Sequence, residues 1–151
     1  MPACQYLGID ANPHYIRFAQ KYFGTKGQFI EGNITHLKSI LSELNLGANS
    51  FDIIIINCVI HHLSDSETHA VLTDVQWALK PEGRFISMDG CYLEKQSPIA
   101  RYLLKADRGQ FVRTDKDYVK LISRFFPKYK TSLRNDLLWV PYTMIVMECG
   151  L

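Results

Sequence analysis

The stretch FDIIIINCVIHHL, residues 51–63, contains the strongest strand pattern in the sequence. Four consecutive isoleucines follow Phe51 and Asp52, so residues 51–57 are apolar on both faces. Such a run is typical of a central parallel strand covered by helices on each side. Asn57 ends this run, and two adjacent histidines, His61 and His62, follow after three further residues. We therefore expect this strand to lie inside an α/β sheet, with polar residues at its carboxyl end.

The segments on both sides alternate between strand and helix patterns. Strands are expected at residues 5–9, 28–31 and 84–89, and helices begin near Asn12-Pro13, at Thr35, and at a capping box formed by Ser64 and Glu67. The resulting β-α-β-α-β-α-β order implies right-handed crossovers and a mostly parallel sheet. Pro81-Glu82-Gly83 is expected to turn the chain back into the fourth strand.

The last third of the chain follows a different pattern. Helices are expected to begin at Ser97-Pro98 and at Thr114, and two strands at 129–137 and 142–148 are close enough to form an antiparallel hairpin. No repeat or linker separates the segments, so the sequence predicts a single domain over residues 1–151.

Composition excludes several classes of protein. The net charge of +2 is too small for a nucleic-acid footprint, and the longest apolar run is too short to span a bilayer. The first residues lack the pattern of a signal peptide. None of the four cysteines forms a CxxC pair, which favours reduced thiols over a disulfide frame or a zinc site. We therefore expect a cytoplasmic protein that binds neither nucleic acid nor membrane.

Four segments, YLGIDANP, FIEGNI, FDIIIINCVIHHL and LKPEGRFISMD, occur in an order that resembles class I S-adenosylmethionine-dependent methyltransferases. KADRGQFVRT matches more weakly. The resemblance implies a Rossmann-like three-layer α/β sandwich that ends in an antiparallel hairpin. It also implies S-adenosyl-L-methionine as cofactor and methyl transfer to a small-molecule substrate.

One part of that family's pattern is missing. Relatives have a strand and a glycine-rich loop before the position of Asp10, and only nine residues precede Asp10 here. We therefore expect an N-terminally truncated domain. The strand at 5–9 could close directly onto 51–57, another chain could fill the slot, which would favour a homo-oligomer, or the sequence could be a fragment.

Two other functions remain open. The chain could be a cofactor-incompetent fragment or interaction module. It could also be a nicotinamide-dependent dehydrogenase, which would share Asp10 and the parallel sheet, although the terminal hairpin and LKPEG argue against this.

Asp10 is the strongest cofactor-binding candidate, because a carboxylate at a strand's carboxyl end can accept hydrogen bonds from both ribose hydroxyls. The alternative is a turn residue that caps the next helix. By resemblance, the cofactor site also includes the segment around Asp10 and the ends of the next two strands. Its further expected members are Ala11, Gly32, Asn33, Ile34, Asn57 and Cys58. Cys58 is expected to be a small buried residue rather than a nucleophile.

His61 is the catalytic candidate, as a general base on a substrate hydroxyl. Side chains of adjacent residues on an extended strand point to opposite sides, so His61 and His62 can both face one site only if the loop curls. His62 is expected to order the loop. No metal is expected, because no recognisable spacing supplies a third ligand. Asp107 and Arg113 could form a surface ion pair, support a lid, or bind an acidic substrate.

Overall fold

The computed structural model describes residues 4–151. These residues form two compact units, which meet between Leu46 and Gly47 in the sequence. Strands and helices alternate through most of the chain, and the α/β class predicted from the sequence is confirmed. None of the helices in the described part of the chain has the length and apolar character needed to cross a bilayer. The strands form a two-stranded sheet in the first unit and a five-stranded sheet in the second.

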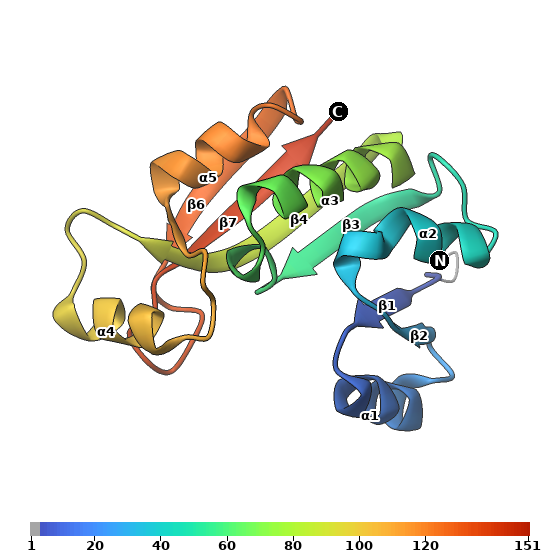
Figure 1. Cartoon of the computed structure of the whole chain (residues 1–151), viewed down its shortest axis with the longest axis horizontal. Coiled ribbons are helices and arrows are strands. Elements are labelled where there is room, and N and C mark those ends of the chain that lie inside the picture. Colours follow the sequence, from blue (N-terminus) through green and yellow to red (C-terminus); the bar gives the residue numbers. More distant parts are fainter. Residues whose placement is uncertain (1–3) are drawn as a thin grey trace. The chain divides into compact units, whose positions relative to one another are not determined.

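The first unit is a β-α-β crossover followed by a short helix (Figure 1). Its elements are β1 (Leu7–Asp10), α1 (Pro13–Phe23), β2 (Gln28–Glu31), η1 (Ile34–His36) and α2 (Leu37–Glu43). β1 and β2 are parallel, with Asp10 opposite Glu31. α1 begins as predicted, since the Asn12 side chain accepts the His14 amide and Pro13 occupies the first turn.

The start of the second helix differs from the prediction that Thr35 caps it. Asn33 is the capping residue instead, and its Oδ1 accepts the Thr35 amide at 3.0 Å. The turn that it caps is η1, and α2 follows from Leu37. Asparagine directly after a strand can bond the backbone two residues ahead, which favours this earlier start.

The second unit carries the five-stranded sheet, in the order β3-β4-β7-β6 with β5 beside β4. Its elements are β3 (Phe51–Asn57), η2 (Ile60–His62), α3 (Asp65–Ala78), β4 (Leu79–Tyr92), α4 (Pro98–Ala106), β5 (Arg113–Thr114), α5 (Asp115–Ile122), β6 (Lys128–Arg134) and β7 (Met144–Gly150). β3 and β5 run parallel to β4, whereas β7 is antiparallel to both β4 and β6. The predicted C-terminal hairpin is therefore confirmed. β4 already starts at Leu79, so residues 81–83 lie within this strand and do not form the separate turn that the sequence predicts.

Helices α3 and α5 lie together on one face of this sheet (Figure 1). Their apolar side chains, including Val71, Leu72 and Ile122, are fully buried against it. On β3, Ile56 is 3% exposed, whereas Ile53 and Ile55, which alternate with it, are 56% and 65% exposed. The burial on both faces that the isoleucine run predicts is therefore not found for β3 in the described residues.

Candidate functional site

The predicted cofactor residues of the first unit gather at the carboxyl ends of β1 and β2. The Gly32 amide donates to the Asp10 carbonyl at 3.0 Å, so the turns after the two strands lie side by side. The exposed Asp10 carboxylate accepts the Asn12 amide through Oδ1 at 2.7 Å. Asp10 therefore does hold the turn before α1, as in the alternative to cofactor binding, and its second oxygen, Oδ2, makes no hydrogen bond within the described residues.

Gly32 also brings α2 close to the sheet. A Cβ at this position would lie 2.6 Å from Cδ1 of Ile40, so a larger residue would require the Ile40 side chain to move. Ile34 starts η1 immediately afterwards. The Asn33 amide group is thus held at a strand end by a short, tightly packed turn.

Asn57 and Cys58 end β3 in the second unit, and both are exposed. Cys58 has φ of 54°, the left-handed region that non-glycine residues rarely adopt, and its amide donates to the Met88 carbonyl at 2.7 Å. Desolvation, together with the charges of Asp89 and Asp107, raises the pKa of the Cys58 thiol. A protonated thiol is a poor nucleophile, which agrees with the prediction that Cys58 is not a nucleophile. The prediction that Cys58 is buried is wrong, because the residue lies exposed just beyond the end of β3.

The histidine pair lies in η2, which curls the chain directly after β3. The His61 and His62 rings are 4.2 Å apart between centroids, so the curled arrangement, rather than the extended one, describes this loop. His61 is only 2% exposed, whereas His62 is exposed. The two side chains therefore reach the same region from different depths.

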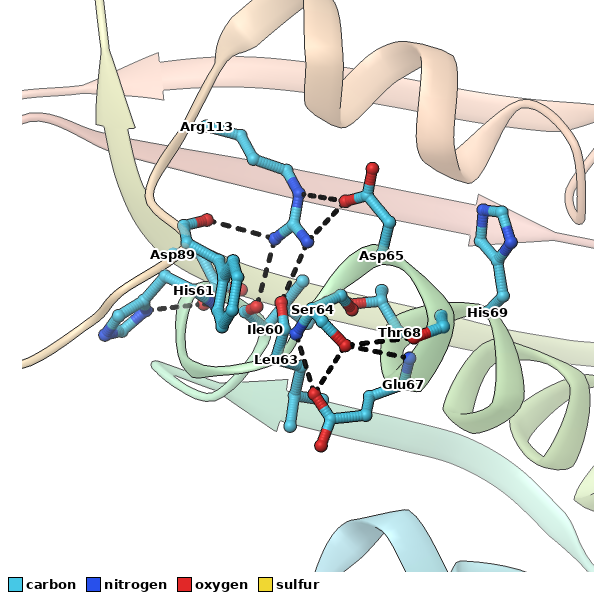
Figure 2. Close-up of polar contacts among 12 residues, drawn as sticks. Ile60, His61, Leu63, Ser64, Asp65, Glu67, Thr68, His69, Asp89 and Arg113 are labelled. Atoms are coloured by element: carbon cyan, nitrogen blue, oxygen red, sulfur yellow. Dashed lines mark hydrogen bonds and ion pairs between the residues drawn. The ribbon is translucent and has the colours of Figure 1, made fainter.

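Asp89, on β4, is the principal partner of His61 (Figure 2). Its Oδ1 lies 2.8 Å from His61 Nδ1 and also accepts the His61 backbone amide at 3.1 Å. Burial raises the pKa of the Asp89 carboxyl, while the hydrogen bonds and charge of His61 act in the opposite direction. With Nδ1 donating to the carboxylate, the neutral imidazole carries its lone pair on Nε2.

Segment 107–111 covers that second nitrogen. Asp107 Oδ1 lies 3.7 Å from His61 Nε2, and the Tyr142 hydroxyl donates to Asp107 Oδ2 at 2.7 Å. Desolvation tends to raise the pKa of the Asp107 carboxyl, but hydrogen bonds from Tyr142 and Gly109 outweigh it and lower this pKa. A Cβ at Gly109 would overlap Cδ2 of His61, so this glycine lies flat against the imidazole ring.

Arg113 fastens the histidine loop from the other side (Figure 2). Its side chain is 9% exposed and contacts the Asp65 carboxylate at 2.7 Å. The same guanidinium donates to three backbone carbonyls, those of Ile60, Leu63 and Phe111. Arg113 therefore does form an ion pair, with the exposed carboxylate of Asp65. It also fastens the loop that carries His61 through backbone carbonyls, a role that the sequence did not predict.

Sequence reasoning did not identify Asp89 or Tyr142 as members of this cluster. The sequence places Asp89 only in the strand at 84–89 and Tyr142 only in the strand at 142–148. One indication for Asp89 was present, because a carboxylate that interrupts the apolar strand at residues 84–89 needs a buried partner. Nothing in the spacing pointed to Tyr142, which lies 35 residues beyond Asp107.

Several solved structures share this fold and match nearly the whole of this chain. A protein from Pyrococcus horikoshii is 19% identical, with a TM-score of 0.68, and the match covers 97% of this chain and 72% of that one. Human N-acetylserotonin methyltransferase, solved in complex with S-adenosylmethionine, is 19% identical, with a TM-score of 0.64 over 99% of this chain and 42% of that one. An arsenic(III) S-adenosylmethionine methyltransferase from Chlamydomonas reinhardtii is 20% identical, with a TM-score of 0.64 over 96% and 55%.

The chain thus spans about half the length of the last two proteins. A search of curated protein sequences finds no match. The family model described as a methyltransferase domain matches residues 1–129, which is most of the chain and includes both groups of site residues except Tyr142. The chain therefore belongs to the methyltransferase-domain family.

Proposed function

We propose that this chain transfers a methyl group from S-adenosyl-L-methionine to a small-molecule acceptor. The observation that carries the proposal is the buried Asp89–His61 pair, placed just beyond the end of β3 in a methyltransferase domain. In open α/β sheets, ligands bind outside the carboxyl ends of the strands. Structural neighbours named for their acceptors add support, because N-acetylserotonin and arsenic(III) are both small.

In this proposal the adenosine part of the cofactor lies against the first unit. Asp10 Oδ2 accepts a ribose hydroxyl, because Oδ1 already accepts the Asn12 amide. Asn33 and the Ile34 backbone contact the adenine ring, while Ala11 and Gly32 supply the backbone between them. For the second unit, considered by itself, we propose that Asn57 and Cys58 contact the methionine part of the cofactor, because both residues are exposed.

The chemical step needs little from the protein, because a sulfonium methyl group is already electrophilic. A lone pair of the acceptor atom forms a bond to the methyl carbon, and the electrons of the carbon–sulfur bond pass to sulfur, which gives the demethylated cofactor. We propose that His61 Nε2 takes the proton released by a hydroxyl acceptor. Asp89 keeps the ring oriented and stabilises the imidazolium that results.

Access to His61 is controlled by its covering segment. The ring is 2% exposed, with Asp107 and Gly109 against it. An acceptor reaches Nε2 only when residues 107–111 move away, so we propose that this segment opens for the acceptor and closes to exclude water.

Calorimetric titration with the demethylated cofactor, S-adenosylhomocysteine, tests the cofactor assignment. We expect saturable binding by the full chain and at least about tenfold weaker binding by Asp10→Asn, since a lost charge-assisted hydrogen bond costs about 1.5–3 kcal/mol. Asp52→Asn, an exposed carboxylate outside the proposed site, is the control. No binding by a folded chain would favour the cofactor-incompetent alternative instead.

Transfer of a radiolabelled methyl group to a panel of phenols and amines then tests the reaction. His61→Asn should lower kcat by about a hundredfold or more for hydroxyl acceptors, because general-base catalysis contributes about 10²–10⁴-fold. Unchanged cofactor binding by the same variant would separate a catalytic loss from misfolding. Full activity of His61→Asn would refute the base assignment.

Cellular location, nucleic-acid binding and self-association are the remaining points of the proposal. We propose a cytoplasmic protein without a nucleic-acid partner, which the small net charge supports, and self-association, which the exposed Ile53 and Ile55 of β3 support. Sedimentation at several protein concentrations tests the second point. A single monomeric species throughout would contradict it.

A further inference from the structure

We propose that His61, His62 and Asp107 form a binding site for a divalent first-row transition-metal ion, with Zn²⁺ as the reference. Each side chain offers one ligand atom, and these atoms all lie within 4.8 Å of one another. The sequence offered no third ligand for the histidine pair, and the fold supplies one from the end of α4. The inference concerns a metal ion bound by the same loop and does not depend on methyl transfer.

The separation of the His61 and Asp107 ligand atoms fits an ion between these two atoms, and the exposed His62 side chain must move to complete the site if it lies near the 4.8 Å limit. His61 Nε2 and Asp107 Oδ1 are 3.7 Å apart, too far for a hydrogen bond. Two ligands of a tetrahedral zinc ion, each at about 2.0–2.1 Å, are about 3.3 Å apart. Binding thus needs a contraction of only a few tenths of an ångström between a buried ring and a half-buried carboxylate.

Both of these ligands are already oriented by neighbouring groups. Asp89 accepts from His61 Nδ1, which leaves the lone pair on Nε2, the atom that faces Asp107. Tyr142 donates to Asp107 Oδ2 at 2.7 Å, and the Gly109 amide donates to Oδ1 at 3.2 Å. Carboxylate–histidine pairs and hydrogen-bonded carboxylates of this kind are the usual outer partners of metal ligands in proteins.

The charges around the ring favour a cation. Two carboxylates, Asp89 and Asp107, approach His61 from opposite nitrogens. Asp89 Oδ2 is buried without a hydrogen-bond partner among the described residues, so part of its charge is not compensated locally. The guanidinium of Arg113 is directed to Asp65 and to backbone carbonyls instead.

The donor set and the exposure indicate which ion fits and how it enters. Two imidazole nitrogens with one carboxylate oxygen suit Zn²⁺ and neighbouring first-row ions, whereas Mg²⁺ and Ca²⁺ prefer oxygen ligands. His62 is exposed and the Asp107 side chain is 29% exposed, which gives an ion a path from solvent. Three protein ligands leave a fourth position for water or an acceptor atom.

An ion on Nε2 occupies the lone pair that the proposed base uses. Metal binding and proton acceptance are therefore mutually exclusive at His61, and Zn²⁺ should inhibit any transfer reaction that depends on this base. Because binding is measured without cofactor or acceptor, failure of the metal site and failure of the methyl-transfer proposal give different results.

Equilibrium dialysis of the full chain against Zn²⁺, with the metal content measured by mass spectrometry, tests the site. We expect one ion per chain, and at least tenfold weaker binding for His62→Asn and for Asp107→Asn. His62 is exposed, so its variant keeps the fold, which circular dichroism checks. His36→Asn removes an exposed imidazole of the first unit and should bind as the unmodified chain does.

Absorption of bound Co²⁺ in the visible range gives a second readout, since it reports nitrogen and oxygen ligands directly. Loss of this absorption in His62→Asn, but not in His36→Asn, would support the site. The proposal is overturned if no ion binds, if both site variants bind as tightly as the unmodified chain, or if His36→Asn weakens binding equally.

Discussion

Replacing Arg113 by lysine tests whether this residue holds the histidine loop through backbone carbonyls or only through Asp65. Lysine keeps the positive charge but lacks the planar fork that reaches several acceptors at once. Arg113 donates to three carbonyls and is 9% exposed. Loss of two of these bonds at about 1.5 kcal/mol each predicts a fall of about 3 kcal/mol in the free energy of unfolding.

Asp65→Asn is the matched control, because it removes the ion pair and leaves the carbonyl bonds. The Asp65 side chain is 76% exposed, so its contribution should lie in the range of about 0–1 kcal/mol typical of surface pairs. Both tryptophans, Trp77 and Trp139, lie in the second unit, so tryptophan fluorescence during urea unfolding follows this unit alone. Equal losses for the two variants would refute the carbonyl-based argument.

Three further predictions concern the same unit. The hydrogen bond from Arg113 lowers the pKa of Asp65, so the pair contributes stability above the unfolded pKa of about 3.9, and this contribution is lost as the pH falls through the lower folded pKa. The difference in free energy of unfolding between the unmodified chain and Asp65→Asn should therefore vanish in acid. A difference that grows in acid would contradict this prediction. Cys58→Gly should leave the free energy of unfolding unchanged or raise it by up to about 1 kcal/mol, because glycine tolerates φ of 54°. Cys58→Val should lower it by at least about 1 kcal/mol. Equal urea midpoints for the two variants would show that the strain is absent. Gly109→Ala should lower the free energy of unfolding by about 1–3 kcal/mol, because the added methyl group forces residues 107–111 off the His61 ring. Arg108→Ala, at an exposed neighbouring position, is the control and should leave stability unchanged. A fully stable Gly109→Ala would mean that the ring is not closely covered.

The elements with local sequence determinants were predictable. Asn12 and Pro13 start α1, and Ser64 with Glu67 forms the capping box of α3, because capping depends on residues only two or three positions apart. The strands β2 and β3 also match their predicted ranges. The start of α2 was missed because a short turn, η1, capped by Asn33, precedes it, and α2 begins at Leu37 without a side-chain cap that the sequence could reveal.

The cluster around His61 was only partly predictable. His61 itself was chosen from its place after a buried strand, but its partner Asp89 lies 28 residues away on β4, and no short-range rule fixes such a pairing. The prediction that both faces of β3 are buried was wrong for a related reason. An apolar run predicts burial on both faces, yet burial depends on which other elements cover each face, and Ile53 and Ile55 remain exposed.

The position of Asp89 divides the histidine cluster into a fixed part and an adaptable part. β4 has hydrogen-bonded neighbours on both edges, β3 on one and β7 on the other, and backbone paired in this way tolerates few insertions. The groups that approach His61 from outside, Asp107 and Gly109, come instead from a connecting segment whose length and composition can drift. A change of sequence or length in that segment would therefore alter what reaches the His61 imidazole, whereas the carboxylate that orients the ring is fixed by the sheet.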